Sequence, residues 1–130
     1  LTVKQVHIRF DANQDYYVFA DKERIEQVLM NLIHNAIQFS DSEAVVDVSL
    51  TKEGQNVNVR IQDYGIGMEK AQLDLIWRRF YKADESRSSK SGAGLGLAIV
   101  KSILDLHEAE VKVGTEPNEG TIFSFKLPLS

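Results

Sequence analysis

Residues 21–39, with the sequence DKERIEQVLMNLIHNAIQF, carry the strongest periodic signal in this chain. Their apolar side chains recur at helical spacing, at Ile25, Val28, Leu29, Leu32, Ile33, Ala36 and Ile37. This period predicts a long amphipathic helix, for which Asp21 is a suitable N-cap. At about 100° per residue, a polar stripe follows the edge of the apolar face. The stripe consists of Gln27, Asn31, Asn35 and Gln38.

Short segments on both sides of this helix predict strands, most of them because apolar residues occupy alternate positions, and residues 17–19 because they follow a polar turn. Strands are expected around residues 6–10, 17–19, 46–50, 57–61, 111–113 and 122–127, with turns at residues 53–55 and 117–120. Residues 70–80 and 95–107 have helical character, whereas residues 84–91 (DESRSSKS) are polar and small, as in a mobile loop. This order favours an α+β fold in which an antiparallel or mixed sheet carries its helices on one face.

The composition is that of one globular domain spanning residues 1–130. Of these residues, 43% are hydrophobic and 26% are charged, which is ordinary for a folded protein. The absence of cysteine excludes disulfides and thiolate zinc sites. A net charge of -4, from 19 acidic and 15 basic residues, argues against nucleic acid as the main partner. Residues 95–100 form the longest apolar run, which is too short to span a bilayer.

The polar stripe on the first helix is one candidate for chemistry. Neutral amide oxygens such as those of Asn31 and Asn35 suit Mg²⁺, a hard cation that prefers oxygen ligands and keeps some of its waters. A solvated helix face also explains two asparagines, and the stripe taken alone favours that simpler interpretation.

Residues 63–68 (DYGIGM) follow directly after an expected strand and form a second candidate group. A carboxylate at a strand end, here Asp63, can accept a hydrogen bond from an exocyclic amine such as that of adenine. The glycines beside it, Gly65 and Gly67, let the backbone approach a flat ring closely. In isolation, a plain Asp-x-Gly turn is the simpler explanation.

Two further groups lie on either side of the polar loop. Arg79 and Lys82, in the segment RFYK, could reach phosphates or could be ordinary cations at a helix C-terminus. Residues 92–97 (GAGLGL) open a helix, where free N–H groups attract a polyphosphate. Their spacing differs from a Rossmann fingerprint, and the sequence contains no Walker A motif. A glycine-rich loop alone is weak evidence for a function.

The order of the four groups is informative where each group alone is not. The sequence resembles the histidine kinase catalytic domain of the gyrase, MutL and histidine-kinase ATPase superfamily. NLIHNAIQFS is similar to its N box, DYGIGM to its G1 box, RRFYKADESRS to its F box and GAGLGL to its G2 box. All four occur in the family's order and spacing, and the resemblance covers essentially the whole chain. It implies the Bergerat ATP-binding fold, a two-layer α/β sandwich whose mixed, mostly antiparallel sheet packs on three helices.

The resemblance implies ATP and Mg²⁺ as cofactors and assigns roles by position. Asn35 would ligate Mg²⁺, with Asn31 beside it, and Asp63 would accept a hydrogen bond from the adenine amine. Gly65 and Gly67 would line the adenine pocket.

The phosphates of ATP are expected at the remaining groups. Arg79 and Lys82 would contact them near a lid formed by residues 84–91, and Arg79 joins Asn31 and Asn35 as an expected catalytic residue. The G2 box would shape the lid hinge and the phosphate end of the site through Gly92, Gly94, Leu95, Gly96 and Leu97.

Two positions at the end of the N box depart from the family pattern. The family usually has Lys-Tyr there, whereas this chain has Gln38 and Phe39. Phe39 can still cover the adenine without offering a hydroxyl, while Gln38 removes a positive charge that would face the phosphates. The superfamily's hydrolytic members usually have a glutamate, a general base, where Asn31 stands. ATP is therefore expected to wait for an incoming nucleophile rather than be hydrolysed quickly.

These expectations describe an enzyme part, a protein-histidine kinase fragment that donates the ATP γ-phosphate to a histidine on a separate helical phosphoacceptor domain. His7, His34 and His107 lack the sequence setting of such a histidine, so the fragment is expected to be inactive alone. Two alternatives stay open. One is a nucleotide-binding module with little transfer activity, which Gln38 favours, and the other is a serine-kinase regulator of a sigma factor.

The resemblance also implies the partners of the parent protein, namely the phosphoacceptor domain and a response regulator, without nucleic acid. The parent is expected to be a homodimer and this fragment a monomer. The chain begins at Leu1 within an alternating, charged segment unlike a signal peptide, which indicates a fragment of a longer protein. The domain is expected in the cytoplasm, with the parent anchored in the cell membrane.

Overall fold

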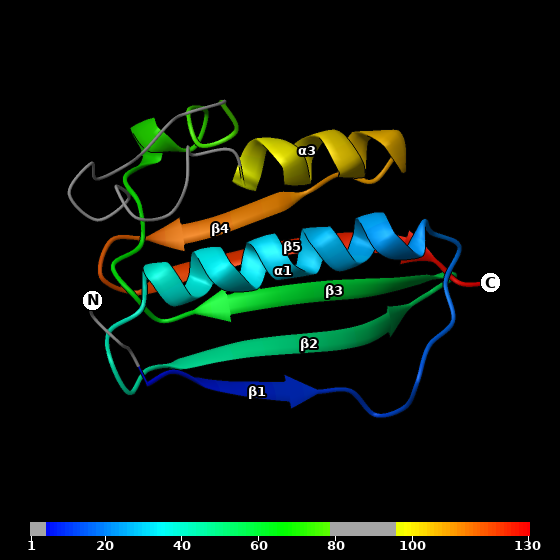
Figure 1. Cartoon of the computed structure of the whole chain (residues 1–130), viewed down its shortest axis with the longest axis horizontal. Coiled ribbons are helices and arrows are strands. Elements are labelled where there is room, and N and C mark those ends of the chain that lie inside the picture. Colours follow the sequence, from blue (N-terminus) through cyan, green and yellow to red (C-terminus); the bar gives the residue numbers. More distant parts are fainter. Residues whose placement is uncertain (1–4, 79–95) are drawn as a thin grey trace.

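Five strands form a single sheet in the computed structural model of the chain, which describes residues 5–78 and 96–130 (Figure 1). The strands are β1 (His7–Asp11), β2 (Val45–Glu53), β3 (Asn56–Asp63), β4 (Lys112–Glu116) and β5 (Gly120–Pro128). Their order across the sheet is β1-β2-β3-β5-β4. β1 runs parallel to β2, and the other neighbouring pairs are antiparallel. The expected mixed, mostly antiparallel sheet is therefore confirmed.

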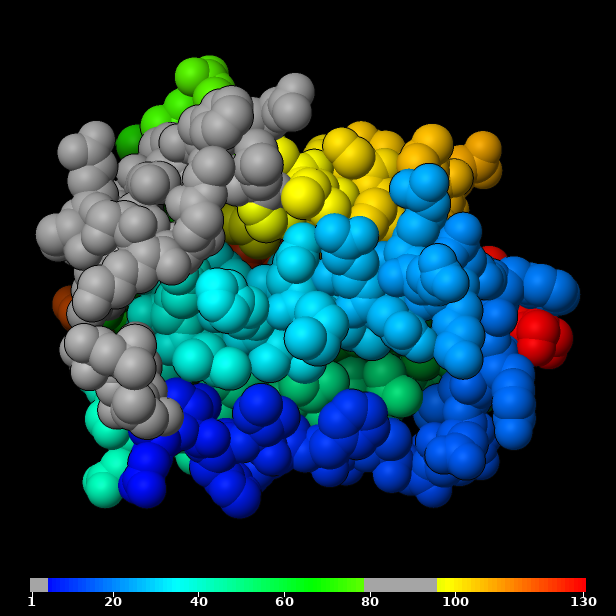
Figure 2. Space-filling view, viewed as in Figure 1, coloured from blue at the N-terminus to red at the C-terminus, as the bar shows by residue number. Residues whose placement is uncertain are grey.

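Two α-helices, α1 (Lys22–Gln38) and α3 (Gly96–Leu106), lie side by side in the layer that covers this sheet (Figure 2). The expected N-cap is present, because the Asp21 side chain accepts a hydrogen bond from the N–H of Arg24 at 3.1 Å. The N–H of Asp21 itself donates to Nε2 of His107 at 3.0 Å, which ties the start of α1 to the end of α3. At the other end of α1, the hydroxyl of Ser40 donates to the carbonyl of Ala36 at 2.7 Å.

The core lies between the helices and the sheet. Its largest fully buried apolar side chains come from both helices and from alternate positions of the three central strands, and they are Phe123, Phe125, Leu32, Ile61, Leu104, Val28, Val46, Val57 and Val100. Burial of each such side chain contributes about 1.5–3 kcal/mol relative to leaving it exposed. Trp77 packs edge-to-face on Phe123, with ring centroids 5.9 Å apart. The two-layer α+β architecture expected from the sequence is thus confirmed.

The strand expected at residues 17–19 does not form. Only Val18 makes a β-bridge, with Leu129, while Tyr17 and Phe19 are 77% and 65% exposed. The residues of this segment favour a strand, but the segment connects β1 to α1 at the end of the sheet, and only Val18 pairs with a neighbouring residue there.

A helix is expected at residues 70–80, of which residues 70–78 are described; they form a short 3₁₀ helix, η1 (Lys70–Gln72), followed by turns and a bend. Successive i→i+3 hydrogen bonds explain the tighter winding, from Leu73 to Lys70, from Leu75 to Gln72 and from Arg78 to Leu75. Residues 84–91, the expected lid, lie outside the described residues. In the two described stretches, no helix is long and apolar enough to cross a membrane.

Candidate functional site

The end of α1, the end of β3 and the β4–β5 turn meet at one end of the sheet. The carbonyl of Phe39, one residue beyond α1, lies against Gly65 and accepts a long hydrogen bond from the N–H of Ile66 at 3.4 Å. The carbonyl of Ile66 accepts from the N–H of Asn118, in the β4–β5 turn, at 2.7 Å. Backbone contacts therefore bring the N box and the G1 box together, with the β4–β5 hairpin beside them.

Asp63 is the buried acidic residue of this cluster. It ends β3 and is only 2% exposed. The N–H of Gly65 donates to its Oδ1 at 2.9 Å, and the backbone of Thr121 on β5 also stabilises its charge. Burial outweighs these donors and raises the pKa of Asp63 above its ordinary value. A desolvated carboxyl group of this kind gains most from a ligand that donates a hydrogen bond to it.

Three glycines permit the close backbone contacts around Asp63. A Cβ on Gly65 would lie 1.9 Å from the carbonyl oxygen of Phe39, and a Cβ on Gly67 would lie 2.0 Å from that of Glu116. A Cβ on Gly120 would lie 2.1 Å from the carbonyl oxygen of Asp63 itself. Side chains are therefore excluded at these positions because another backbone already occupies the space.

The expected residues on α1 are half-buried and lead toward the same end of the molecule. They are Asn31, Asn35 and Gln38. Asn31 donates from Nδ2 to the carbonyl of Gly96 at 3.2 Å, which links α1 to the first residue of α3. Leu97 packs against the core, whereas Gly96 is exposed and has nothing within 4 Å of a Cβ position. The structure thus brings Asn31 to the G2 box, and Phe39 to the G1 box.

The other predicted site residues lie outside the described part of the chain, and their roles stay predictions. They are Arg79, Lys82, Gly92, Gly94 and Leu95. Among the residues that the structure describes, no group of three or more His, Cys, Asp or Glu side chains is placed to hold a metal ion. Amide oxygens such as those of Asn31 and Asn35 are ligands of the kind that Mg²⁺ accepts alongside phosphates and waters.

Two threonines that the sequence motifs do not include complete the cluster. Thr121 is 5% exposed, and its hydroxyl lies 2.9 Å from Oγ1 of Thr115. Thr115 Oγ1 also accepts from the N–H of Met68 at 2.9 Å and donates to the carbonyl of Gly120 at 3.1 Å. These bonds fix the β4–β5 hairpin against the G1 box. The alternation along β5 is the sequence signal that could have identified Thr121. It is the polar member of an inward-facing series that continues with Phe123, Phe125 and Leu127.

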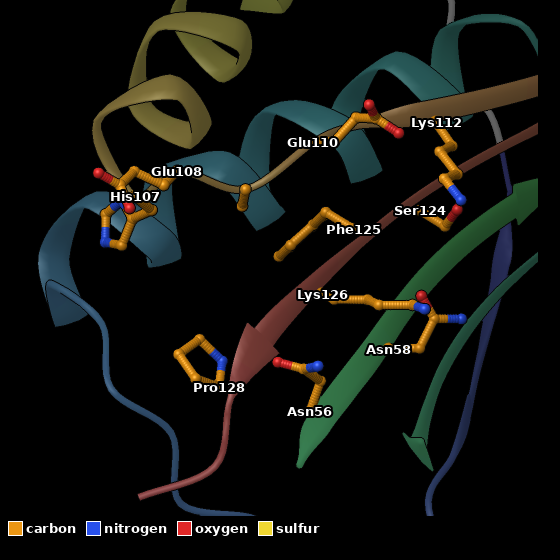
Figure 3. Close-up of a pocket in the computed structure, with 11 residues that line it drawn as sticks. Asn56, Asn58, His107, Glu108, Glu110, Lys112, Ser124, Phe125, Lys126 and Pro128 are labelled. Atoms are coloured by element: carbon orange, nitrogen blue, oxygen red, sulfur yellow. The ribbon is translucent and has the colours of Figure 1, made fainter. Parts of the chain in front are cut away.

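A separate cavity of about 500 Å³ lies at the opposite end of the sheet (Figure 3). It is lined by Asn56 and Pro128 where β3 begins and β5 ends, and by His107 and Glu110 in the connection from α3 to β4. The described residues that line it include no predicted site residue. The cavity is therefore distinct from the cluster around Asp63.

Residues 20–130 match the family of histidine kinase-, DNA gyrase B- and HSP90-like ATPases. The sensor-like histidine kinase SenX3 of Mycolicibacterium smegmatis is 34% identical over 125 residues, which cover 95% of this chain and 33% of SenX3. The solved catalytic domain of histidine kinase ThkA has a TM-score of 0.80 at 26% identity, covering 95% of this chain and 78% of that one. Full-length ShkA in complex with AMPPNP has a TM-score of 0.82 at 28% identity, covering 96% of this chain and 26% of that one. The chain spans a third or less of the length of the curated relatives it matches.

Proposed function

Since the chain belongs to the family of histidine kinase-, DNA gyrase B- and HSP90-like ATPases, we propose that it is the ATP-binding catalytic domain of a two-component sensor histidine kinase. In that role it donates the γ-phosphate of ATP to a histidine on a separate phosphoacceptor domain. Its 34% sequence identity to SenX3 and its structural similarity to the catalytic domain of ThkA both support this role.

The observation that carries the proposal is the buried carboxyl group of Asp63 beside two close-packed glycines. The exocyclic amine of adenine donates a hydrogen bond, and a desolvated carboxyl group accepts it well. Guanine carries a carbonyl oxygen at the corresponding ring position, which would face the carboxylate as a second acceptor. The site should therefore select ATP over GTP. Gly65 and Gly67 let the backbones of Phe39 and Glu116 pack against the turn that follows Asp63, so the chain around the carboxyl group is closely packed.

The residues of α1 fit a hydrated Mg²⁺ bound to the phosphates. Asn35 would contribute an amide oxygen, with Asn31 beside it, and the ion would supply charge neutralisation for the phosphates. Asn31 already donates to the carbonyl of Gly96, so it would also position the start of α3. Because Asn31 is an amide, it cannot act as a general base toward water. Arg79 and Lys82 would complete the phosphate contacts.

The proposed partners are a helical phosphoacceptor domain of the parent protein and a response regulator, without nucleic acid. The parent would be a homodimer anchored in the cell membrane, with this domain on the cytoplasmic side. These assignments are extended from sensor kinases that are longer than the chain. The chain covers 33% of the length of SenX3, for example.

Calorimetric titration tests the nucleotide site. In the presence of Mg²⁺, the chain should bind ATP, should bind adenosine more weakly, and should bind GTP much more weakly than ATP. The Asp63→Ala variant should bind neither ATP nor adenosine. Failure of the unmodified chain to bind ATP would remove the proposal.

Phosphotransfer from radiolabelled ATP to the phosphoacceptor domain of the parent protein tests the reaction. Acid-labile phosphate on histidine is the expected product, and the chain alone should acquire none. Acid-stable phosphate on serine would identify the serine-kinase alternative. Binding of ATP without any transfer would favour the nucleotide-binding module, the alternative that the neutral Gln38 favours.

A further inference from the structure

Tyr64 lies between two residues of the proposed nucleotide site but directs its side chain to the other face of the sheet. Asp63 precedes it and Gly65 follows it. Asp63 is buried on the helix side, whereas Tyr64 is 49% exposed. Its hydroxyl donates to Oδ2 of Asp47 on β2 at 2.5 Å. We call residues 63–65 the base-binding turn, because Asp63 and Gly65 belong to the proposed nucleotide site. The side chain of Tyr64 therefore tethers this turn on the face of the sheet opposite α1 and α3.

Asp47 is held in turn by Arg9 on the edge strand β1. Arg9 donates from Nε and Nη2 to the two carboxylate oxygens of Asp47 at 2.6 and 2.8 Å. The two residues are paired in the β1–β2 register. Asp47 faces Gln62 on β3, so Tyr64 reaches it diagonally, as same-face neighbours on adjacent strands do. Because the ion pair is bidentate, it fixes the orientation of the Asp47 carboxylate better than a single exposed contact would.

The protonation states favour this arrangement. Hydrogen bonds from Arg9 and then from Tyr64 lower the pKa of Asp47 to about 2. The hydrogen bond to Asp47 raises the pKa of Tyr64 above its ordinary value. At neutral pH the carboxylate is therefore ionised and the phenol is protonated, so the donor and the acceptor are both in the required form.

Backbone packing holds the same turn from the opposite side. A Cβ on Gly120 would lie 2.1 Å from the carbonyl oxygen of Asp63 and 2.8 Å from Cα of Tyr64. Gly65 lies against the carbonyl of Phe39. A rotation of the chain at Tyr64 would separate the Gly65 N–H from Oδ1 of Asp63, which are 2.9 Å apart. The tether opposes that rotation.

We propose that the side chains of Arg9, Asp47 and Tyr64 form a positioning device for the base-binding turn. Tyr64 does not contact the base, but it holds Asp63 and Gly65 in the geometry that recognises adenine. This inference rests on the proposed nucleotide site. It assigns a specificity role to Tyr64, which lies within DYGIGM but received no role from the sequence, and to Arg9 and Asp47, which lie outside the four motifs.

Tyr64→Phe tests the device, because it removes the hydroxyl and keeps the ring. Affinity for ATP and for adenosine should fall by the same factor, about fivefold, which corresponds to about 1 kcal/mol. Preference for ATP over GTP should fall as well. Hydrogen exchange of the Gly65 amide should accelerate, a readout that needs no nucleotide. Asp47→Asn keeps an acceptor for the Tyr64 hydroxyl, so its ATP affinity should lie between those of the wild type and Tyr64→Phe. Asp47→Ala removes the acceptor, so its loss of ATP affinity should be at least as large as that of Tyr64→Phe.

Glu53→Gln is the matched control. It weakens the ion pair with Lys126, whose Nζ lies 3.6 Å from the Glu53 carboxylate near the far end of the same sheet. This variant should leave nucleotide affinity and Gly65 exchange unchanged. Wild-type affinity and exchange in Tyr64→Phe would overturn the proposal, as would an equal loss of affinity in Glu53→Gln. If the unmodified chain binds neither ATP nor adenosine, the nucleotide site itself is wrong, and Gly65 exchange still decides whether Tyr64 holds the turn.

Discussion

The two ends of the sheet require glycine for different reasons. Gly54 makes the turn between β2 and β3 with φ of +61°, and nothing lies within 4 Å of its Cβ position. Gly65, at the other end, would place a Cβ 1.9 Å from the carbonyl oxygen of Phe39. The first glycine satisfies a local backbone conformation, and the second makes room for a distant segment. The comparison shows that the candidate site is assembled by tertiary packing of backbones, while the hairpin end is specified locally.

The largest effect is expected for Gly65→Ala. The added methyl group would overlap the backbone at the end of α1, so α1 and the G1 box must separate, at a cost of about 3 kcal/mol in unfolding free energy. ATP binding should be lost as well, because the separation displaces Asp63 from the end of α1. Urea unfolding and calorimetry measure the two effects.

Gly54→Ala is the control for this variant. It carries only the strain of the left-handed backbone conformation, about 1 kcal/mol, and should leave ATP binding intact. If the two alanine variants lose equal stability, the proposed difference between the ends of the sheet is wrong.

Asp63→Asn should separate stability from binding. An amide in place of the carboxylate presents donor hydrogens to the adenine amine, so ATP affinity should fall about 30-fold, which corresponds to a lost hydrogen bond of about 2 kcal/mol. The fold should become more stable at neutral pH, because the amide avoids burial of a charge. Calorimetry and chemical denaturation measure both, and a less stable Asp63→Asn would contradict the account of this residue.

The pH dependence of that stability difference has a definite sign. Burial raises the pKa of Asp63 in the folded protein, so the folded state binds the proton more tightly than the unfolded state does. The resulting stabilisation is fully present below the unfolded pKa and is lost as pH rises through the folded pKa. The advantage of Asp63→Asn over the wild type should therefore grow as the pH is raised across that window.

For the candidate site, sequence patterns pointed to residues that lie within one element or one turn. The helical period of α1 located Asn31 and Asn35, and the sequence DYGIGM located Asp63 and Gly65, because in both cases the signal is local. Residues 17–19 show the opposite case, since these strand-favouring residues make only one β-bridge, between Val18 and Leu129.

Residues that act through pairing of distant strands were not predicted. Thr121 and Gly120 meet Asp63 only because β5 pairs with β3, and the link from Tyr64 to Asp47 and Arg9 exists only because three strands lie side by side. Each of these contacts joins residues that are far apart in the sequence, so no short motif contains it.

Asn35→Ala should reduce Mg²⁺-dependent ATP affinity about tenfold, or about 1.4 kcal/mol, since one amide ligand is lost while phosphates and waters remain. Adenosine binding should not change. Asn58→Ala is a matched control, because Asn58 is a half-buried asparagine on β3 that lines the cavity at the other end of the sheet. Titrations with and without Mg²⁺ compare the two variants, and unchanged affinity in Asn35→Ala would remove this residue from the metal site.

The smallest effect is expected for Gln38→Lys. Residue 38 is the last residue of α1, half-buried and on the same stripe as Asn35. A lysine there could direct its ammonium group toward the phosphates, and charge-assisted hydrogen bonds are roughly twice as strong as neutral ones, so a gain of about 1 kcal/mol is expected. Salt screening would reduce this gain, so it should shrink at high ionic strength. A cation at a helix C-terminus also stabilises the helix, which would raise the unfolding temperature without distinguishing between ligands.

Adenosine separates these two contributions. Because adenosine has no phosphate, Gln38→Lys should strengthen binding of ATP and leave binding of adenosine as it is. Gln27→Lys adds the same charge on the same stripe near the exposed start of α1 and should change neither affinity. Titrations of all three proteins with both ligands decide the matter. Equal shifts for ATP and adenosine in Gln38→Lys would mean that residue 38 does not face the phosphates.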